Sequence, residues 1–142
     1  MEDVYIARAG ALSAKRNTES KIQALCTAAG LETMVSEGDL TAIKVHFGER
    51  GNDAFVNALH VAGVVRRVKE IGAKPFLTDT NTLYLGGRRN AVDHIMTALS
   101  HGFCFPVTEC PVIIADGLKG TNSRDVEVYG KHFDSVKIAA DI

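Results

Sequence analysis

The fold of this chain is decided by residues 74–90, KPFLTDTNTLYLGGRRN. The apolar start of this stretch predicts a short strand, and Asn90 at its end is a good cap for a following helix. Between them lies a loop rich in polar, glycine and arginine residues, which begins at Asp79. In an open α/β sheet, ligands bind beyond the carboxyl ends of the parallel strands. The stretch therefore predicts a binding site at this edge of the sheet.

Two other predicted strands end in the same way. Residues 42–45 run into the polar loop 46–53, and residues 112–115 run into the loop 116–120. Because the carboxyl ends of parallel strands meet at one edge of a sheet, the three polar strand ends would form a single site.

The remaining periodicities predict strands that alternate with helices. We expect strands at residues 4–7, 40–45, 74–78 and 112–115, and helices at residues 18–29, 55–71 and 90–101. In the third helix, the apolar spacing predicts a core-facing stripe of Val92, Ile95, Met96 and Leu99. This alternation indicates an α/β fold with three layers, a mainly parallel sheet and helices on both faces.

The pattern changes after Gly120. Residues 125–129 and 134–139 alternate between apolar and polar side chains and are separated by a glycine-containing turn, which predicts a terminal strand pair. The sequence stops directly after this strand-like run. We therefore expect residues 1–142 to be one domain, the N-terminal portion of a longer protein, or else a domain whose end is covered by a partner.

Composition excludes several classes of partner. Sixteen Lys and Arg residues nearly balance 17 Asp and Glu residues, so no net field recruits nucleic acid or an anionic membrane. No apolar stretch approaches the roughly 20 residues of a membrane span. The three cysteines contain no closely spaced pair, which favours reduced thiols in a cytoplasmic protein.

His46, Glu49 and Asp79 are the candidate catalytic residues. His46 and Glu49 are three residues apart, a spacing that suits an acid-base pair, a metal ligand with a carboxylate, or ordinary structural hydrogen bonds. A hard divalent cation such as magnesium would suit Asp79 and Asp116 with Glu49. A transition metal would need a second imidazole, for which His94 is the obvious candidate. The spacing alone assigns no metal site.

The glycines and arginines before Asn90 predict recognition of a small anionic ligand. Backbone N–H groups at a helix N-terminus attract phosphate or carboxylate, and a guanidinium adds a planar donor fork. Two solvated arginines beside a turn are an equally good interpretation. No Walker A or Gly-x-Gly-x-x-Gly motif is present, so nucleotide binding is not implied. The candidate ligand- or cofactor-binding residues are Asn81, Tyr84, Gly86, Gly87, Arg88, Asp116 and Lys119.

Three motifs carry a resemblance to a family. They are KVHFGE at residues 44–49, PFLTDTNTLY at residues 75–84 with Gly86 and Arg88, and IIADGLKG at residues 113–120. From about Leu40 onward, the chain resembles the uncharacterised iron-sulfur centre proteins. The resemblance implies a domain of unknown function that continues into a ferredoxin-like pair of cysteine clusters.

The cysteine-cluster segment is not part of this sequence. A 4Fe-4S cluster needs about four closely spaced thiolates, whereas this chain has three scattered ones. We therefore expect no cluster in this chain, and the resemblance implies clusters only in the C-terminal domain.

Two functions remain open at this point. In the first, the strand ends bind a small anionic ligand or a metal for redox-linked chemistry. In the second, the domain is a non-catalytic scaffold that docks the ferredoxin module or another protein. The two differ in whether the strand-end side chains line an open pocket or bind one another.

Overall fold

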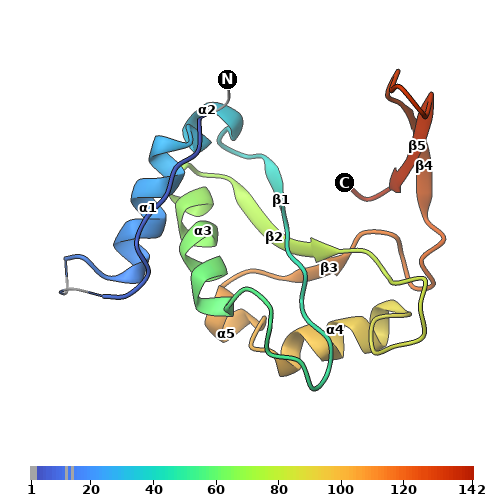
Figure 1. Cartoon of the computed structure of the whole chain (residues 1–142), viewed down its shortest axis with the longest axis horizontal. Helices are drawn as coiled ribbons and strands as arrows, with labels where there is room; N and C mark the ends of the chain where they lie inside the picture. The colour runs from blue at the N-terminus through green and yellow to red at the C-terminus, as the bar shows by residue number, and fades with distance from the viewer. Residues whose placement is uncertain (1–2, 12, 14) are drawn as a thin grey trace.

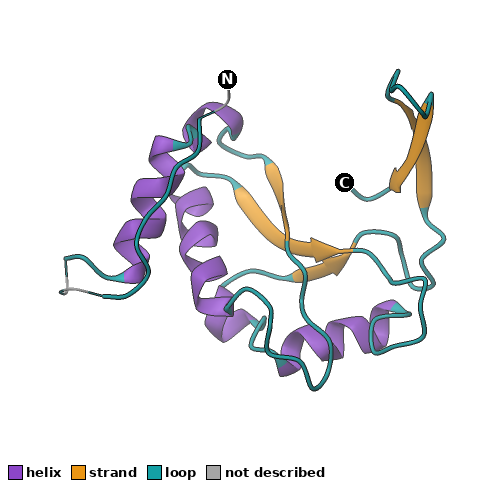
Figure 2. Cartoon of the chain, viewed as in Figure 1, coloured by secondary structure: helices purple, strands orange, loops and turns teal. Residues whose placement is uncertain are grey.

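The computed structural model of the chain describes residues 3–11, 13 and 15–142, and it confirms the α/β class (Figures 1 and 2). The helices are α1 (Thr18–Ala28), α2 (Leu31–Met34), α3 (Ala58–Glu70), α4 (Ala91–Ser100) and α5 (Phe105–Thr108). The strands are β1 (Leu40–Lys44), β2 (Lys74–Asp79), β3 (Val112–Ile114), β4 (Ser123–Glu127) and β5 (Ser135–Ala139). Among the described residues, no helix combines the length and apolarity needed to cross a membrane.

The strands form two sheets. β1, β2 and β3 are parallel and lie in that order, and β4 pairs with β5 in an antiparallel hairpin. The predicted parallel sheet and terminal strand pair are therefore confirmed. The hairpin returns to the sheet at its base, where the backbone N–H of Asp141 donates to the carbonyl of Ala115.

The strand order explains why one face of the sheet is bare. Connections between adjacent parallel strands are almost always right-handed, and the order β1-β2-β3 never reverses. Both crossover helices, α3 and α4, therefore lie on the same face, where they contact β2 and β3. On the opposite face Leu40 is 76% exposed and Ile113 is 42% exposed. The prediction of helices on both faces is thus wrong for the described residues.

The core lies between the covered face and the two crossover helices. Leu77 and Ile114 from the sheet are buried against Val61 and Val65 of α3. Phe103 closes the core beyond α4, where its ring meets the ring of Phe47 edge to face at a centroid distance of 5.1 Å. This core fixes the direction in which the strands point and hence where their carboxyl ends meet.

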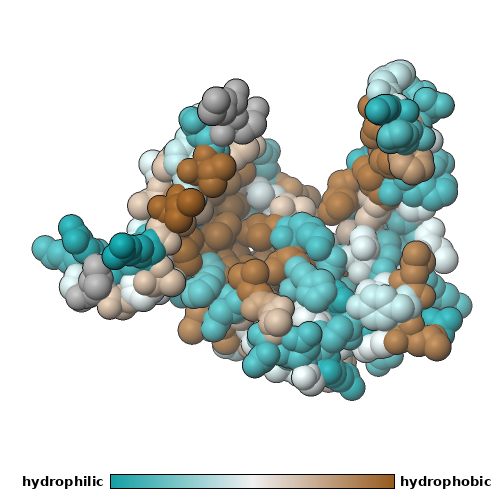
Figure 3. Space-filling view, viewed as in Figure 1, coloured by the Kyte–Doolittle hydropathy of each residue, from teal (hydrophilic) through white to brown (hydrophobic). Residues whose placement is uncertain are grey.

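The predicted first strand is wrong. Residues 4–7 form no strand and lie along α1 (Figure 1). Together with the helix they line a shallow groove. Val4 is 80% exposed and Ile6 is 86% exposed, and apolar surface is visible beside α1 in Figure 3. Side-chain propensity for strands reflects packing on a half-buried sheet surface, and these residues have no such surface to join.

Asparagine caps set the helix starts. The Oδ1 atoms of Asn17, Asn57 and Asn90 accept hydrogen bonds from backbone N–H groups of the first turns of α1, α3 and α4. The predicted cap at Asn90 is confirmed. The second helix begins at Ala58, later than predicted, because Asn57 has an extended backbone conformation and ends the preceding loop.

Three of the four residues in the predicted apolar stripe of the third helix, Val92, Met96 and Leu99, are exposed, whereas Ile95 is partly buried and packs against the core. Val92 is 63% exposed and Met96 is 52% exposed, whereas His94 and Thr97 are fully buried. The inner face packs closely against the loop before the helix, because Thr97 Oγ1 donates to the carbonyl of Gly87 at 3.1 Å. Small or polar side chains fit this close approach, so the prediction from periodicity alone is wrong for Val92, Met96 and Leu99 and right for Ile95.

The same substitution, Leu→Ala, on each of the two faces of the sheet tests whether one face is buried and the other exposed. Leu77→Ala should lower the free energy of unfolding by about 2–5 kcal/mol, because Leu77 is fully buried in the core. Leu40→Ala should change it by less than about 0.5 kcal/mol, because Leu40 is on the exposed face. Urea unfolding measures both. Equal losses would show that the uncovered face is buried in solution.

Candidate functional site

Loops that follow β1, β2 and β3 meet at one edge of the sheet, as the sequence predicts. Glu49 follows β1, Asp79 ends β2, and Asp116 follows β3. Side-chain hydrogen bonds connect all three loops through Arg88 and Asn81. The structure thus brings most of the candidate residues together.

Arg88 is the centre of this arrangement and is 3% exposed. Its Nε donates to Glu49 Oε1 at 2.7 Å, and its Nη1 donates to Asp79 Oδ2 at 3.2 Å. Its Nη2 donates to the hydroxyl of Tyr84 at 2.6 Å, and that hydroxyl donates to Glu49 Oε1 at 2.5 Å. The guanidinium therefore holds two carboxylates and a phenol from different segments.

The charge of Glu49 is stabilised by the same contacts. Burial opposes ionisation of Glu49, but the hydrogen bonds from Tyr84 and Arg88 outweigh it and lower the pKa of the carboxyl. His46 adds a smaller favourable charge interaction. Glu49 is consequently a carboxylate at neutral pH and acts as an acceptor, which does not suit the role of a general acid.

Asp79 has a second cation that the sequence did not single out. Lys44 Nζ lies 3.3 Å from Asp79 Oδ1, and the Lys44 side chain is otherwise 65% exposed. The parallel register places Lys44 beside Thr78, one residue before Asp79. This register follows from strand pairing, so the local sequence carried no signal for the contact.

His94 approaches Asp79 from the helix side. It is fully buried, and its Nε2 lies 3.8 Å from Asp79 Oδ2, which is too long for a hydrogen bond. Neither ring nitrogen has a hydrogen-bond partner in the described part of the chain. Burial lowers the pKa of His94 and the Asp79 carboxylate only partly offsets this, so the ring is neutral at pH 7.

Asn81 and Asp116 form a second connection. The backbone N–H of Asn81 lies 3.0 Å from both carboxylate oxygens of Asp116, and its Nδ2 donates to Asp116 Oδ1 and to the carbonyl of Gly117, both at 2.8 Å. A Cβ at Gly120 would lie 3.2 Å from both residues, and the φ of Gly120 is +71°. Glycine is therefore required there, and the loops after β2 and β3 are held together.

The other candidate residues lie at the border of this network. His46 is exposed, and its Nδ1 accepts from the backbone N–H of Gly48 at 3.1 Å. Lys119 is also exposed. Gly86 and Gly87 allow close packing, because a Cβ would lie 3.1 Å from the ring of Tyr84 in the first case and from Thr97 in the second.

No metal-binding group is formed by the described residues. No three or more His, Cys, Asp or Glu side chains gather there in a way that could hold a metal ion. All three cysteines are free: Cys26 lies in α1, Cys104 directly precedes α5 without a side-chain capping hydrogen bond, and Cys110 is buried. Burial raises the pKa of the Cys26 and Cys110 thiols, which makes both poor nucleophiles at neutral pH.

Removing the Arg88 guanidinium should destabilise the fold. Arg88→Ala should lower the free energy of unfolding by about 3–5 kcal/mol, because Asp79 stays buried without this partner. Arg88→Lys should recover only part of the loss, since one ammonium cannot reach all three acceptors. The exposed Arg89→Ala is the control, with a change below about 0.5 kcal/mol. Similar unfolding curves for the Arg88 and Arg89 variants would contradict the network.

Acid should destabilise the chain through His94. The pKa of His94 is below its ordinary value of 6.5 in the folded chain, so the unfolded chain binds the proton first as the pH falls. Stability should therefore decrease below about pH 6.5, with a slope of at most about 1.4 kcal/mol per pH unit. Urea unfolding between about pH 5.5 and 7.5 measures this slope. His94→Gln should flatten it, whereas a variant of the exposed His132 should keep it; equal slopes for the wild type and His94→Gln would contradict the assignment.

Comparison with known proteins places the chain in one family. No curated protein and no solved structure matches it. Residues 41–142 match a family described as a domain of unknown function, DUF362. This match begins in β1 and includes Glu49, Asp79, Arg88 and Asp116, so it covers the whole strand-end network. Because it spans more than half of the chain, the chain belongs to the DUF362 family.

Proposed function

We propose that this chain is the α/β domain of a cytoplasmic iron-sulfur protein and that it acts as a non-catalytic docking domain for a ferredoxin-like module. One observation carries this proposal: the strand-end side chains bind one another. Arg88, the best candidate for anion recognition, already donates to Glu49, Asp79 and Tyr84.

Anion binding at Arg88 would be costly in this arrangement. The incoming anion would have to replace carboxylate and phenol acceptors, and Asp79, whose side chain is 7% exposed, would lose a buried cation. Within the network of ion pairs and hydrogen bonds, two cations, Lys44 and Arg88, face three carboxylates, Glu49, Asp79 and Asp116. The cations of this network therefore carry no excess positive charge for an added anion.

The resemblance to iron-sulfur centre proteins supports the choice of partner. The cysteines of this chain suit a cluster poorly, because there are three of them and Cys110 is buried in the core. Clusters would therefore belong to the docked module, with cysteine thiolates of that module as their ligands. Free thiols in this chain are consistent with a reducing compartment.

A second candidate function is binding of a small anionic ligand or a divalent metal at the strand ends. Its support is a set of buried polar atoms without hydrogen-bond partners in the described residues: Thr78 Oγ1, Asn81 Oδ1 and both ring nitrogens of His94. Buried polar atoms usually have partners. In this second function His46, Glu49 and Asp79 would carry the chemistry, and Lys119 would face the ligand.

Two titrations separate these functions. Calorimetry with a purified two-cluster ferredoxin should give saturable binding to the chain. Thermal shift with phosphate, nucleotides, dicarboxylates, Mg²⁺ and Mn²⁺ should leave the melting temperature unchanged. A ligand at 100 times its Kd would raise it by about 5–11 °C, so binding would be obvious.

The opposite pattern would overturn the docking function. A melting shift with one of these small ligands that disappears in Asn81→Asp, together with no heat of binding to ferredoxin, would favour the ligand site. The exposed Arg89→Ala serves as the control in both titrations.

A further inference from the structure

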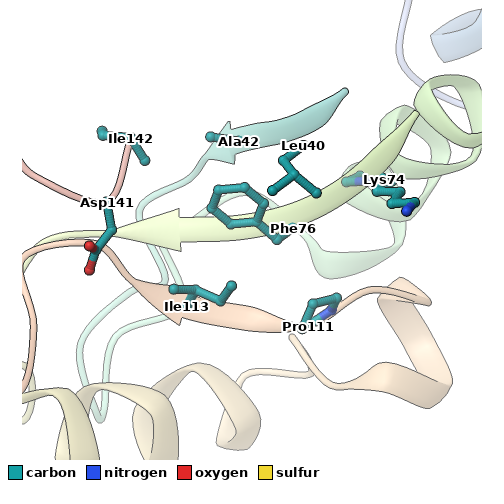
Figure 4. Close-up of a pocket in the computed structure, with 9 residues that line it drawn as sticks. Leu40, Ala42, Lys74, Phe76, Pro111, Ile113, Asp141 and Ile142 are labelled. Atoms are coloured by element: carbon teal, nitrogen blue, oxygen red, sulfur yellow. The ribbon is translucent and has the colours of Figure 1, made fainter. Parts of the chain in front are cut away.

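The uncovered face of the parallel sheet forms an apolar groove of about 620 Å³ (Figure 4). It is lined chiefly by Leu40, Ala42, Phe76, Pro111, Ile113 and Ile142. The residues come from all three parallel strands and from the end of the chain that follows β5. None of the strand-end candidate residues lines this groove.

The exposure of this face is unusual for its architecture. Parallel sheets in α/β proteins are covered on both faces, because their strands are apolar on both sides. Here Leu77 on one face is fully buried, while Leu40 on the other is 76% exposed. Ile113 is 42% exposed, and the strand order directs α3 and α4 to the opposite face.

The groove has the size of one α-helix. The two spacings between three adjacent strands add up to about 10 Å, which is close to the diameter of a helix with its side chains. β2 is six residues long, or about 20 Å, which corresponds to about 14 residues of helix. A single helix of this length would cover the exposed side chains of all three strands.

Charges at the two ends of the groove give the helix a direction. Among the residues that line the groove, Lys74 lies where the strands begin and Asp141 lies at the other end (Figure 4). Lys44, at the end of β1, is paired with Asp79 at 3.3 Å and does not line the groove. A helix carries partial positive charge at its N-terminus and partial negative charge at its C-terminus. Complementarity therefore places the helix N-terminus near Asp141 and its C-terminus near Lys74. This direction is antiparallel to the strands, as in the crossover helices of the opposite face.

We propose that the groove binds one amphipathic α-helix of a partner polypeptide, antiparallel to β1, β2 and β3. The inference rests on the proposed docking function and names the element by which the partner is held. The apolar side of the helix covers Leu40, Phe76 and Ile113, and its polar side faces solvent. Burial of these side chains supplies the affinity, and the end charges supply the orientation.

The test uses a synthetic 14-residue helical peptide with Leu and Ala on one side and Gln on the other, capped at both ends. In NMR titration of the 142-residue chain, shift changes should be confined to β1, β2, β3 and residues 141–142. A nitroxide at the peptide N-terminus should broaden the amide of Asp141, and one at the C-terminus should broaden that of Lys74. A peptide of the same composition in scrambled order should bind more weakly by about tenfold or more.

Variants locate the binding surface. Leu40→Glu and Ile113→Glu should each weaken peptide binding by about tenfold or more. Leu83→Glu is the matched control, because Leu83 is fully exposed in the loop before α4, away from the groove, and should leave binding unchanged. Circular dichroism confirms that all three variants are folded.

Several results would overturn the inference. Equal binding of the scrambled peptide, equal weakening by Leu83→Glu, or reversed nitroxide broadening would each do so. So would dimerisation of the chain in sedimentation that Ile113→Glu abolishes, because the groove would then hold a second copy. If ferredoxin binds the wild type and Leu40→Glu equally well, the result supports the docking function and contradicts the proposal that the groove binds a helix.

Discussion

The guanidinium of Arg88 is the contact on which the strand-end edge depends. It is almost fully buried, and its three partners come from the loop after β1, the end of β2 and the loop before α4. A planar donor fork satisfies acceptors in only one arrangement, so the three segments are fixed relative to one another. Without it, Glu49 and Asp79 would bring two negative charges together beside a buried histidine.

The position of the Arg88 loop also determines which side of α4 is buried. The loop that carries Arg88 passes close to α4, and the hydroxyl of Thr97 donates a hydrogen bond to the carbonyl of Gly87 in this loop. His94 fills the space beside Asp79, and Val92 and Met96 are left on the outside. The helix therefore buries polar and small residues, because such residues allow it to pack close to Asp79 and to the loop that carries Arg88.

Local signals in the sequence were sufficient for most of the elements. Caps such as Asn90 and alternating patterns such as residues 134–139 depend on neighbours a few residues away, and these predictions are confirmed. The bare face of the sheet was not predictable in this way, because it follows from the order of β1, β2 and β3. The contact between Arg88 and Glu49 was also not predictable from local signals, since 39 residues separate them in sequence. Sequence reasoning could place both residues at one edge of the sheet, but it could not decide that they bind each other.

The strand-end network and the bare face of the sheet differ in the free energy with which they would bind a ligand. At the strand ends, an incoming anion must first separate Arg88 from the buried carboxylate of Asp79, and a broken buried pair costs about 3–5 kcal/mol. On the bare face, no buried ion pair has to be broken, and full burial of an exposed apolar side chain contributes about 1.5–3 kcal/mol. Covering Leu40, which is 76% exposed, contributes at most this much, and covering Ile113, which is 42% exposed, contributes less. The first region resists a ligand and the second favours one. This difference is the basis of the proposal that a polypeptide covers the sheet.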